Sequence, residues 1–174
     1  MTGVQTCALP IYQHAPQFVA LGDRMAVMVD GRIRQEGPVQ EVFRHPADAQ
    51  VAESVGMENV LPVEVVDREG GLVTLRVGAA RLQCLDTEAC PTWACIRAED
   101  VALARETAEV SSVRNRLAGR VQSVLLEGPL ARVELDCGFP LVAAITAQSA
   151  GDMSLKPGDL VYAVVKATAV HLTA

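Results

Sequence analysis

The side chains best able to do chemistry are cysteines and carboxylates, and their spacing favours neither metal binding nor catalysis. The five cysteines include no Cys-x-x-Cys pair, and no histidine or second pair completes a zinc set around Cys90 and Cys95. Glu99 and Asp100 are adjacent and would point to opposite faces of a strand, so they form no catalytic pair. We therefore expect no metal site, no catalytic residue, and the reduced thiols of a cytoplasmic protein.

The motifs of nucleotide hydrolysis are also missing from this sequence. It has no GxxxxGK[ST] phosphate loop, no apolar strand ending in an Asp-Glu pair and no LSGGQ-like segment. Without a phosphate cradle and magnesium ligands, ATP has nowhere to bind. We expect this chain to have no ATPase activity of its own.

Composition narrows the possible partners. The chain has 174 residues, of which 50% are hydrophobic and only 3% aromatic, and its net charge is −6. This balance favours a folded protein with an aliphatic core and argues against nucleic acid as a partner. No apolar run reaches the roughly 20 residues that a membrane-spanning helix needs.

The N-terminal region combines a hairpin with short helices. Asp30–Gly31 separates two β-rich runs, which is typical of a hairpin turn. Pro38 can begin a short helix that extends through Phe43 and ends before Pro46. The residues from 47 to 55 suggest a second short helix.

The rest of the chain reads as short strands and contains a weak internal repeat. Asn59-x-Leu61-x-x-x-Val65 recurs as Asn115-x-Leu117-x-x-x-Val121, and Ile96–Arg97–Ala98 recurs as Val165–Lys166–Ala167. Each pair of motifs can bracket one five-stranded module of the OB type. We predict a mainly β fold of two small OB-type barrels preceded by an α/β segment, although chance similarity between valine-rich strands is an alternative. The predicted domains are 12–57, 58–109 and 110–174.

The first eleven residues do not fit this organisation. They read MTGVQTCALPI, have no helical or strand periodicity, and resemble the conceptual translation of a sequencing adapter. We expect them to be foreign to the protein, which would then have begun further upstream, with this chain as its C-terminal piece.

Charge differs between the predicted modules. Residues 12–109 carry 9 basic and 16 acidic side chains, for a net charge of −7, whereas residues 110–174 carry 6 and 5, for a net charge of +1. An anion site is therefore more plausible in the second module than in the first.

Residues 19–60 resemble the end of the ATPase domain of ABC-transporter importers. The matching motifs are Leu21–Ile33, Gln35-x-Gly37, Glu41–Val42–Phe43 and His45–Pro46. In that family this stretch follows a switch histidine and leads into a C-terminal accessory domain. His14 lies one residue out of register with that histidine, so we assign it no catalytic role.

Residues 110–174 resemble the molybdopterin-type TOBE (Mop) module, and residues 58–106 resemble a degenerate copy of it. The motifs are Ser112-x-Arg114–Asn115-x-Leu117-x-Gly119-x-Val121, Ile145–Thr146-x-x-Ser149, Leu155–Asp159 and Val165–Lys166–Ala167-x-x-Val170. The resemblance implies binding of molybdate or tungstate in the second module. The first module offers Arg97 where the second has Lys166, but it lacks the Ser-x-Arg-Asn motif, so we interpret it as structural.

The chemistry of such a ligand fits these residues. A tetrahedral dianion has acceptor oxygens and no donors at neutral pH, so its site needs donors only, partly shielded from water. Donors of this kind are Ser112, Arg114, Thr146, Lys166 and the backbone N–H of Ala167. Asn115 is expected to hold a turn instead of touching the ligand.

The resemblance implies a C-terminal regulatory part of a molybdate-type importer ATPase. Such a protein is cytoplasmic and peripheral to the inner membrane, works as a homodimer with membrane permease subunits, and binds ATP only in the part upstream of this chain. Two alternatives stay open: a stand-alone oxyanion-storage protein, and a module with only a dimerising role in an importer of sulfate, sugars, polyamines or iron.

Overall fold

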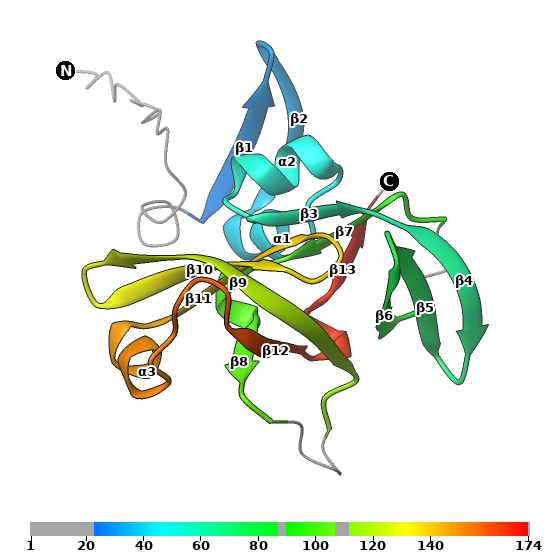
Figure 1. Cartoon of the computed structure of the whole chain (residues 1–174). Helices are drawn as coiled ribbons and strands as arrows, with labels where there is room; N and C mark the ends of the chain where they lie inside the picture. The colour runs from blue at the N-terminus through cyan, green and yellow to red at the C-terminus, as the bar shows by residue number, and fades with distance from the viewer. Residues whose placement is uncertain (1–22, 87–89, 107–111, 174) are drawn as a thin grey trace, which may run out of the picture.

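The computed structural model describes residues 23–86, 90–106 and 112–173, and it is mainly β, as predicted (Figure 1). The foreign segment predicted at residues 1–11, together with His14, lies outside the described residues.

The N-terminal part is a hairpin followed by two short helices. Its elements are β1 (Arg24–Val29), β2 (Arg32–Pro38), α1 (Val39–Arg44) and α2 (Ala49–Ser54). The predicted turn is confirmed: Asp30 and Gly31 have φ values of 50° and 73°, in the left-handed region that Asp-Gly turns use. Asp48 is the N-cap of helix α2, and its side chain accepts a hydrogen bond from the Val51 N–H at 2.9 Å.

The two halves of the β region contain similar series of elements. The first half holds β3 (Asn59–Pro62), β4 (Glu64–Glu69), β5 (Leu72–Val77), β6 (Ala80–Leu85), β7 (Trp93–Ile96), the 3-10 turn η2 (Ala98–Asp100) and β8 (Ala102–Ala104). The second holds β9 (Asn115–Glu127), β10 (Leu130–Asp136), β11 (Pro140–Thr146), α3 (Ala147–Asp152), β12 (Leu160–Val165), the 3-10 turn η3 (Ala167–Ala169) and β13 (His171–Thr173). Helix α3 falls where the second copy is longer, between Ile145 and Pro157.

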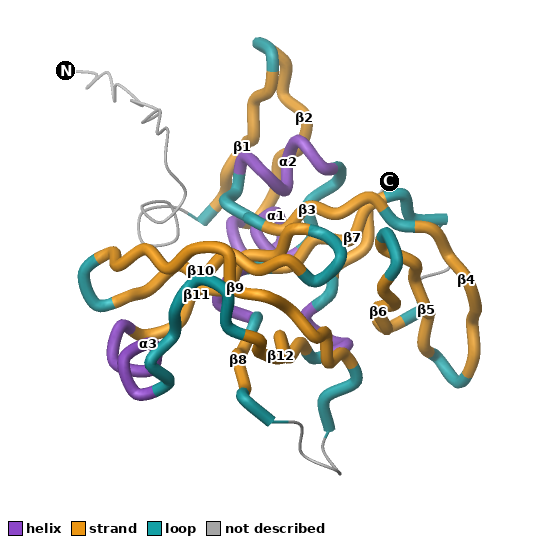
Figure 2. Tube along the Cα trace, in the orientation of Figure 1, coloured by secondary structure: helices purple, strands orange, loops and turns teal. Residues whose placement is uncertain are grey.

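The halves are interlocked by an exchange of their last strands. Strand β8 of the first half pairs with β12 in the five-stranded sheet β11-β10-β9-β12-β8, while β13 of the second half pairs with β7 in the sheet β13-β7-β3. Strands β4, β5 and β6 form the remaining sheet of the first half. Figure 2 shows β8 beside β12, apart from β4, β5 and β6 of its own half.

Strand register confirms the internal repeat. Val165 pairs with Asn115 in the second half, just as Ile96 pairs with Asn59 in the first. The exchanged strands repeat this relation, because β12 pairs with β8 in the way that β7 pairs with β13. The two halves therefore repeat the same strand pairings at these positions.

One apolar core runs through both halves. It includes the fully buried Leu75, Leu82 and Ile96 of the first half and Leu135 and Leu141 of the second. A smaller cluster around Val42, Val51, Val55 and Cys95 joins the N-terminal part to β7.

Two buried asparagines join the halves. The Asn115 amide donates to the Gln83 carbonyl at 2.9 Å and accepts from the Gln83 N–H at 2.6 Å. Asn59 makes the same pair of bonds with Val142, at 2.9 and 2.6 Å. Gln83 lies in β6 and Val142 in β11, each at the edge of its sheet, so each amide covers an exposed strand edge. The expectation that Asn115 holds a turn is wrong: it connects the modules.

Candidate functional site

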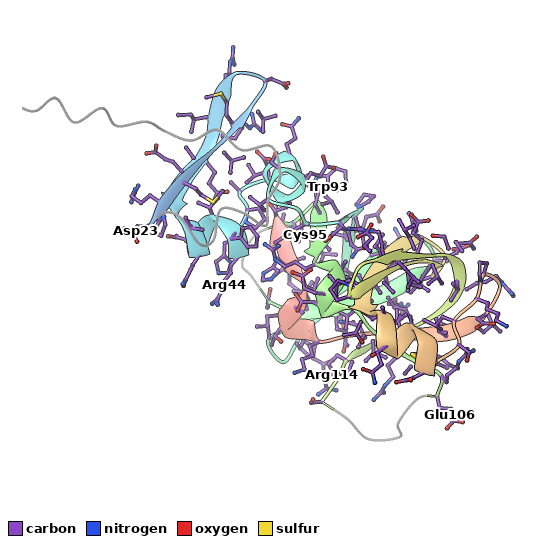
Figure 3. The ribbon with its side chains drawn as sticks, turned by 90° about the vertical axis from the view of Figure 1, so that its left-hand side faces the viewer. Asp23, Arg44, Trp93, Cys95, Glu106 and Arg114 are labelled. Atoms are coloured by element: carbon purple, nitrogen blue, oxygen red, sulfur yellow. The ribbon has the colours of Figure 1, made fainter. Side chains whose placement is uncertain are left out.

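Four of the five predicted donors lie at one end of the paired strands β9 and β12. The last register pair there joins Asn115 to Val165, so Arg114 and Lys166 are the next residues on the two strands. Ser112 lies two residues before Arg114, and Ala167 begins η3 directly after Lys166. In Figure 3 Arg114 lies at the lower edge of the molecule, while the β1–β2 hairpin projects at the upper left.

These donors have no acceptors within the described part of the chain. Neither Arg114 nor Lys166 makes a side-chain hydrogen bond or ion pair there, and the N–H of Ala167 has no acceptor there either. By contrast, five other arginines are paired with carboxylates: Arg34, Arg68, Arg76, Arg105 and Arg132. Two positive charges and a backbone donor at one strand end suit an acceptor-only anion.

The donors are also open to solvent in a single chain. Ser112, Arg114 and Lys166 are exposed, and only Ala167 is buried, at 7% exposure. Charge-assisted hydrogen bonds are weakened by water, which also competes for the anion. A strong oxyanion site therefore needs something to cover this end of the strands.

Thr146 does not join this group within one chain. It pairs with Leu130, which in turn pairs with Glu127 at the far end of β9 from Asn115. A 13-residue strand is up to about 40 Å long at roughly 3.3 Å per residue. The Thr146 hydroxyl instead caps α3, accepting from the Ser149 N–H at 3.0 Å and lying 2.8 Å from the Ser149 hydroxyl. The five predicted residues thus form no single cluster in one chain.

The first half has different residues at the positions equivalent to the donor group. The repeat puts Glu58 at the position of Arg114, Arg97 at that of Lys166 and Ala98 at that of Ala167. The Ala98 N–H donates to Glu58 Oε2 at 3.1 Å. Glu58 Oε1 lies 3.5 Å from Nη2 of Arg132, a residue of β10. The sequence reasoning missed both Glu58 and Arg132, although extending the repeat by one residue before Asn59 would have indicated Glu58.

Arg97 is occupied elsewhere. Its guanidinium lies over the Phe43 ring, 3.9 Å from the centroid, and also donates to the Phe43 carbonyl. Arg97 therefore attaches the N-terminal part to the β region.

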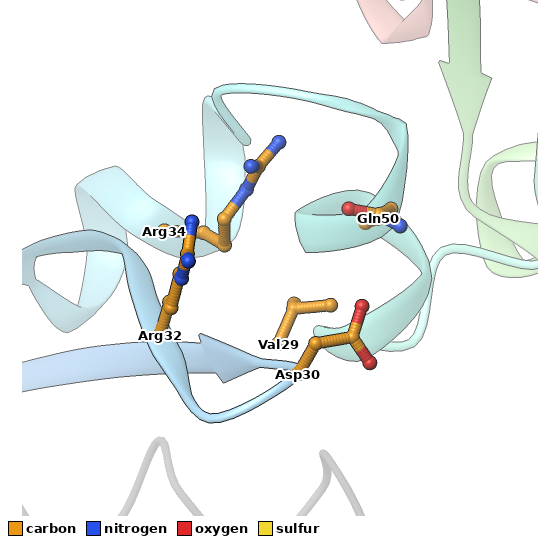
Figure 4. Close-up of a pocket in the computed structure, with 5 residues that line it drawn as sticks. All are labelled: Val29, Asp30, Arg32, Arg34 and Gln50. Carbon is orange, nitrogen blue, oxygen red and sulfur yellow. The ribbon is translucent and has the colours of Figure 1, made fainter.

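Two hollows formed by described residues lie away from the donor group. One lies between the hairpin turn and α2 and is lined by Val29, Asp30, Arg32, Arg34 and Gln50 (Figure 4). Arg34 of this hollow is already paired with Asp48 at 2.7 Å. A second lies between β8, β11 and α3 and includes Leu103 and Met153. Neither includes Arg114 or Lys166.

The described residues offer no other centre for chemistry. They contain no group of three or more metal-ligating side chains and no helix long and apolar enough to cross a membrane. Burial raises the pKa of the Cys84, Cys95 and Cys137 thiols to about 11, with nearby acidic side chains adding to the effect, so these three thiols are unreactive at neutral pH.

Comparisons with known proteins connect this geometry to a family. Residues 111–172 match the TOBE domain. The molybdate/tungstate import ATP-binding protein WtpC of Pyrococcus horikoshii is 30% identical over 166 residues, which are 95% of this chain and 46% of WtpC. The chain thus spans less than half the length of this relative. The spermidine/putrescine import ATP-binding protein PotA of Ruegeria pomeroyi is 44% identical over 65 residues, 37% of this chain and 18% of PotA.

A solved structure has a similar fold over most of the chain. The cytoplasmic molybdate-binding protein ModG, solved with molybdate bound, superposes with a TM-score of 0.61 at 25% identity. The match covers 69% of this chain and 98% of ModG. The OB-type fold predicted from the repeat is therefore confirmed.

Proposed function

We propose that this chain is the C-terminal regulatory region of a molybdate- or tungstate-type ABC importer ATPase and that its second half binds the oxyanion. The observation that carries the proposal is the donor group of Arg114, Lys166 and the Ala167 N–H, which has no acceptor among the described residues. It lies in the segment that matches the TOBE domain. The names of WtpC and ModG, which refer to molybdate or tungstate, supply the ligand class.

Each donor has a separate role in this proposal. Arg114 supplies a planar fork that can reach two oxygens, and Lys166 supplies a compact point charge. The Ala167 N–H and the Ser112 hydroxyl orient the remaining oxygens. No step requires ligation by cysteine or histidine, because the oxygens already enclose the metal.

A second copy of the chain completes the site. The exposure of Arg114 and Lys166 leaves a bound dianion in water, and a homodimer would cover it. The same pairing would supply Thr146 from the partner, which the fold of one chain keeps at the other end of β9. Sedimentation at tens of micromolar with and without molybdate tests this part; a monomer under both conditions contradicts it.

The whole protein would use the site to sense oxyanion inside the cell. Binding changes transport only if the oxyanion favours one arrangement of the paired ATPase domains over another. ATP would bind upstream of this chain, next to the permease subunits in the membrane, and this chain alone would not hydrolyse ATP. ATPase turnover that stays with the purified chain through successive columns would overturn this last point.

Titration calorimetry with molybdate, tungstate and sulfate tests the site. We expect the wild type to bind molybdate and tungstate, and Arg114→Ala or Lys166→Ala to weaken binding by about 2–5 kcal/mol. Arg97→Ala is the matched control, because Arg97 occupies the position of Lys166 in the other half but contacts Phe43. Absence of heat with every oxyanion, or damage from Arg97→Ala alone, would show that the donor group is not the site.

A second candidate is supported by the match to PotA. In this second candidate function the module only holds two subunits together as a dimer, within an importer of a different solute. It predicts a stable dimer that binds no oxyanion, so sedimentation and calorimetry together separate it from the first. A stand-alone oxyanion-storage role predicts instead that the reading frame upstream of Tyr12 contains no nucleotide-binding motifs.

A further inference from the structure

The first half contains the same backbone framework as the donor group, but a carboxylate lies in it. Glu58 stands directly before Asn59 at the start of β3, as Arg114 stands directly before Asn115 at the start of β9. Ala98 begins η2 as Ala167 begins η3. The two positions are therefore equivalent in the fold and opposite in charge.

The contacts of Glu58 are those expected of a bound anion. One carboxylate oxygen accepts from the Ala98 N–H at 3.1 Å, and the other faces Arg132 Nη2 at 3.5 Å. The Glu58 side chain is 24% exposed. An ionised carboxylate is acceptor-only, like an oxyanion, and so satisfies the same donors. In the second half the equivalent N–H, on Ala167, has no acceptor among the described residues.

The cations around this position come from different elements in the two halves. Arg97, the counterpart of Lys166, is engaged with Phe43 of α1. The guanidinium that faces Glu58 is instead that of Arg132, on β10 of the other half. The first half thus keeps a donor set, formed by the Ala98 N–H and Arg132, with Glu58 as its occupant; the Nε of Arg132 also lies 3.7 Å from Oε1 of Glu127.

We propose that Glu58 is a built-in anion that keeps the first half from binding an oxyanion. An incoming dianion would have to displace a covalently attached negative charge and would be repelled by it. The chain would consequently bind one oxyanion, in the second half, instead of two. This inference rests on the proposed function, because it takes oxyanions as the ligand class of the framework.

Changing Glu58 should open a second site. Glu58→Arg restores in the first half the side chain that the second half has at Arg114. It frees the Ala98 N–H, while Arg132 keeps its ion pair with Glu127. Glu64→Arg is the matched control: Glu64 is an exposed residue of the same half, paired with Arg76, and the substitution changes the net charge by the same amount. The measurement is the number of molybdate ions bound per chain, by titration calorimetry and by equilibrium dialysis.

We expect one molybdate per chain for the wild type and for Glu64→Arg, and two for Glu58→Arg. One molybdate for a folded Glu58→Arg chain, or two for Glu64→Arg as well, would overturn the inference while leaving the proposed function intact. A wild-type chain that binds no molybdate would overturn the proposed function. If Glu58→Arg then binds one molybdate, the role of Glu58 is still supported. If Glu58→Arg also binds no molybdate, both the proposed function and the role of Glu58 are refuted.

A milder substitution covers the case in which Glu58→Arg fails to fold. Glu58→Ala removes the carboxylate and frees the Ala98 N–H without adding a cation, so a second molybdate should bind at least about tenfold more weakly than the first, for want of one charge-assisted hydrogen bond. A Glu58→Ala chain that shows no second binding event at millimolar molybdate would overturn the inference.

Discussion

Replacing Asn115 by alanine should destabilise the whole β region, because this side chain closes the contact between its halves. Asn115 is 3% exposed, and its amide makes two hydrogen bonds to the backbone of Gln83, at 2.6 and 2.9 Å. Alanine would leave both the N–H and the carbonyl of Gln83 without a partner. An unsatisfied buried polar group costs about 1–3 kcal/mol.

The two groups together give about 2–6 kcal/mol, and we expect the lower half of this range because the bonds are only partly buried. Such a loss is a large share of the roughly 5–15 kcal/mol that stabilises a typical domain. The assay is equilibrium unfolding in urea, followed by circular dichroism, with the midpoint and slope fitted separately.

Two further variants make this test specific. Asn59→Ala removes the equivalent contact with Val142 and should cost a similar amount. Ser123→Ala removes an exposed side-chain bond to Glu134 and should change the free energy of unfolding by less than about 0.5 kcal/mol. A loss below about 1 kcal/mol for Asn115→Ala would refute the idea that this residue joins the halves, and would restore the expectation of a local turn.

Four other outcomes are expected. The free energy of unfolding should fall as the pH drops below 6.5, because burial and the nearby His45, Arg97 and Arg44 lower the pKa of His171 against the opposing effect of Asp100. At such a pH the unfolded chain takes up a proton that the folded chain resists. Unfolding of the wild type and of His171→Gln, each at pH 5.5 and 7.5, should therefore show a smaller pH effect in the variant. Gly119→Ala should lower the melting temperature, because an added Cβ would lie 2.7 Å from the sulfur of Cys137; an unchanged melting temperature would mean that the strand shifts freely. Thiol alkylation at pH 8 should label the exposed Cys90 in the folded chain and leave the three buried cysteines, Cys84, Cys95 and Cys137, unlabelled until urea is added; rapid labelling of these three without urea would contradict their burial. Deleting residues 1–11 should leave the melting temperature unchanged, whereas a loss of several degrees would mean that they pack as native structure.

Local sequence patterns predicted much of the fold. The turn at Asp30–Gly31 needs two residues that can adopt the left-handed backbone conformation, and the preference of Asp and Gly for it does not depend on the rest of the chain. The recurring Asn-x-Leu and Arg/Lys-Ala motifs likewise marked equivalent strand ends, because the same local sequence forms the same backbone in both halves. Residue type alone also shows that these side chains are hydrogen-bond donors and are not metal ligands.

Only the tertiary structure decided which donors meet. Arg114 and Lys166, 52 residues apart, reach one strand end through the pairing of β9 with β12, whereas Thr146 is carried to the other end of β9 by β10 and β11. The exchange of β8 and β13 and the bond from each asparagine to the opposite half depend on contacts between distant segments. Such contacts leave no local periodicity in a sequence, because each strand has the same alternation whichever neighbour it pairs with.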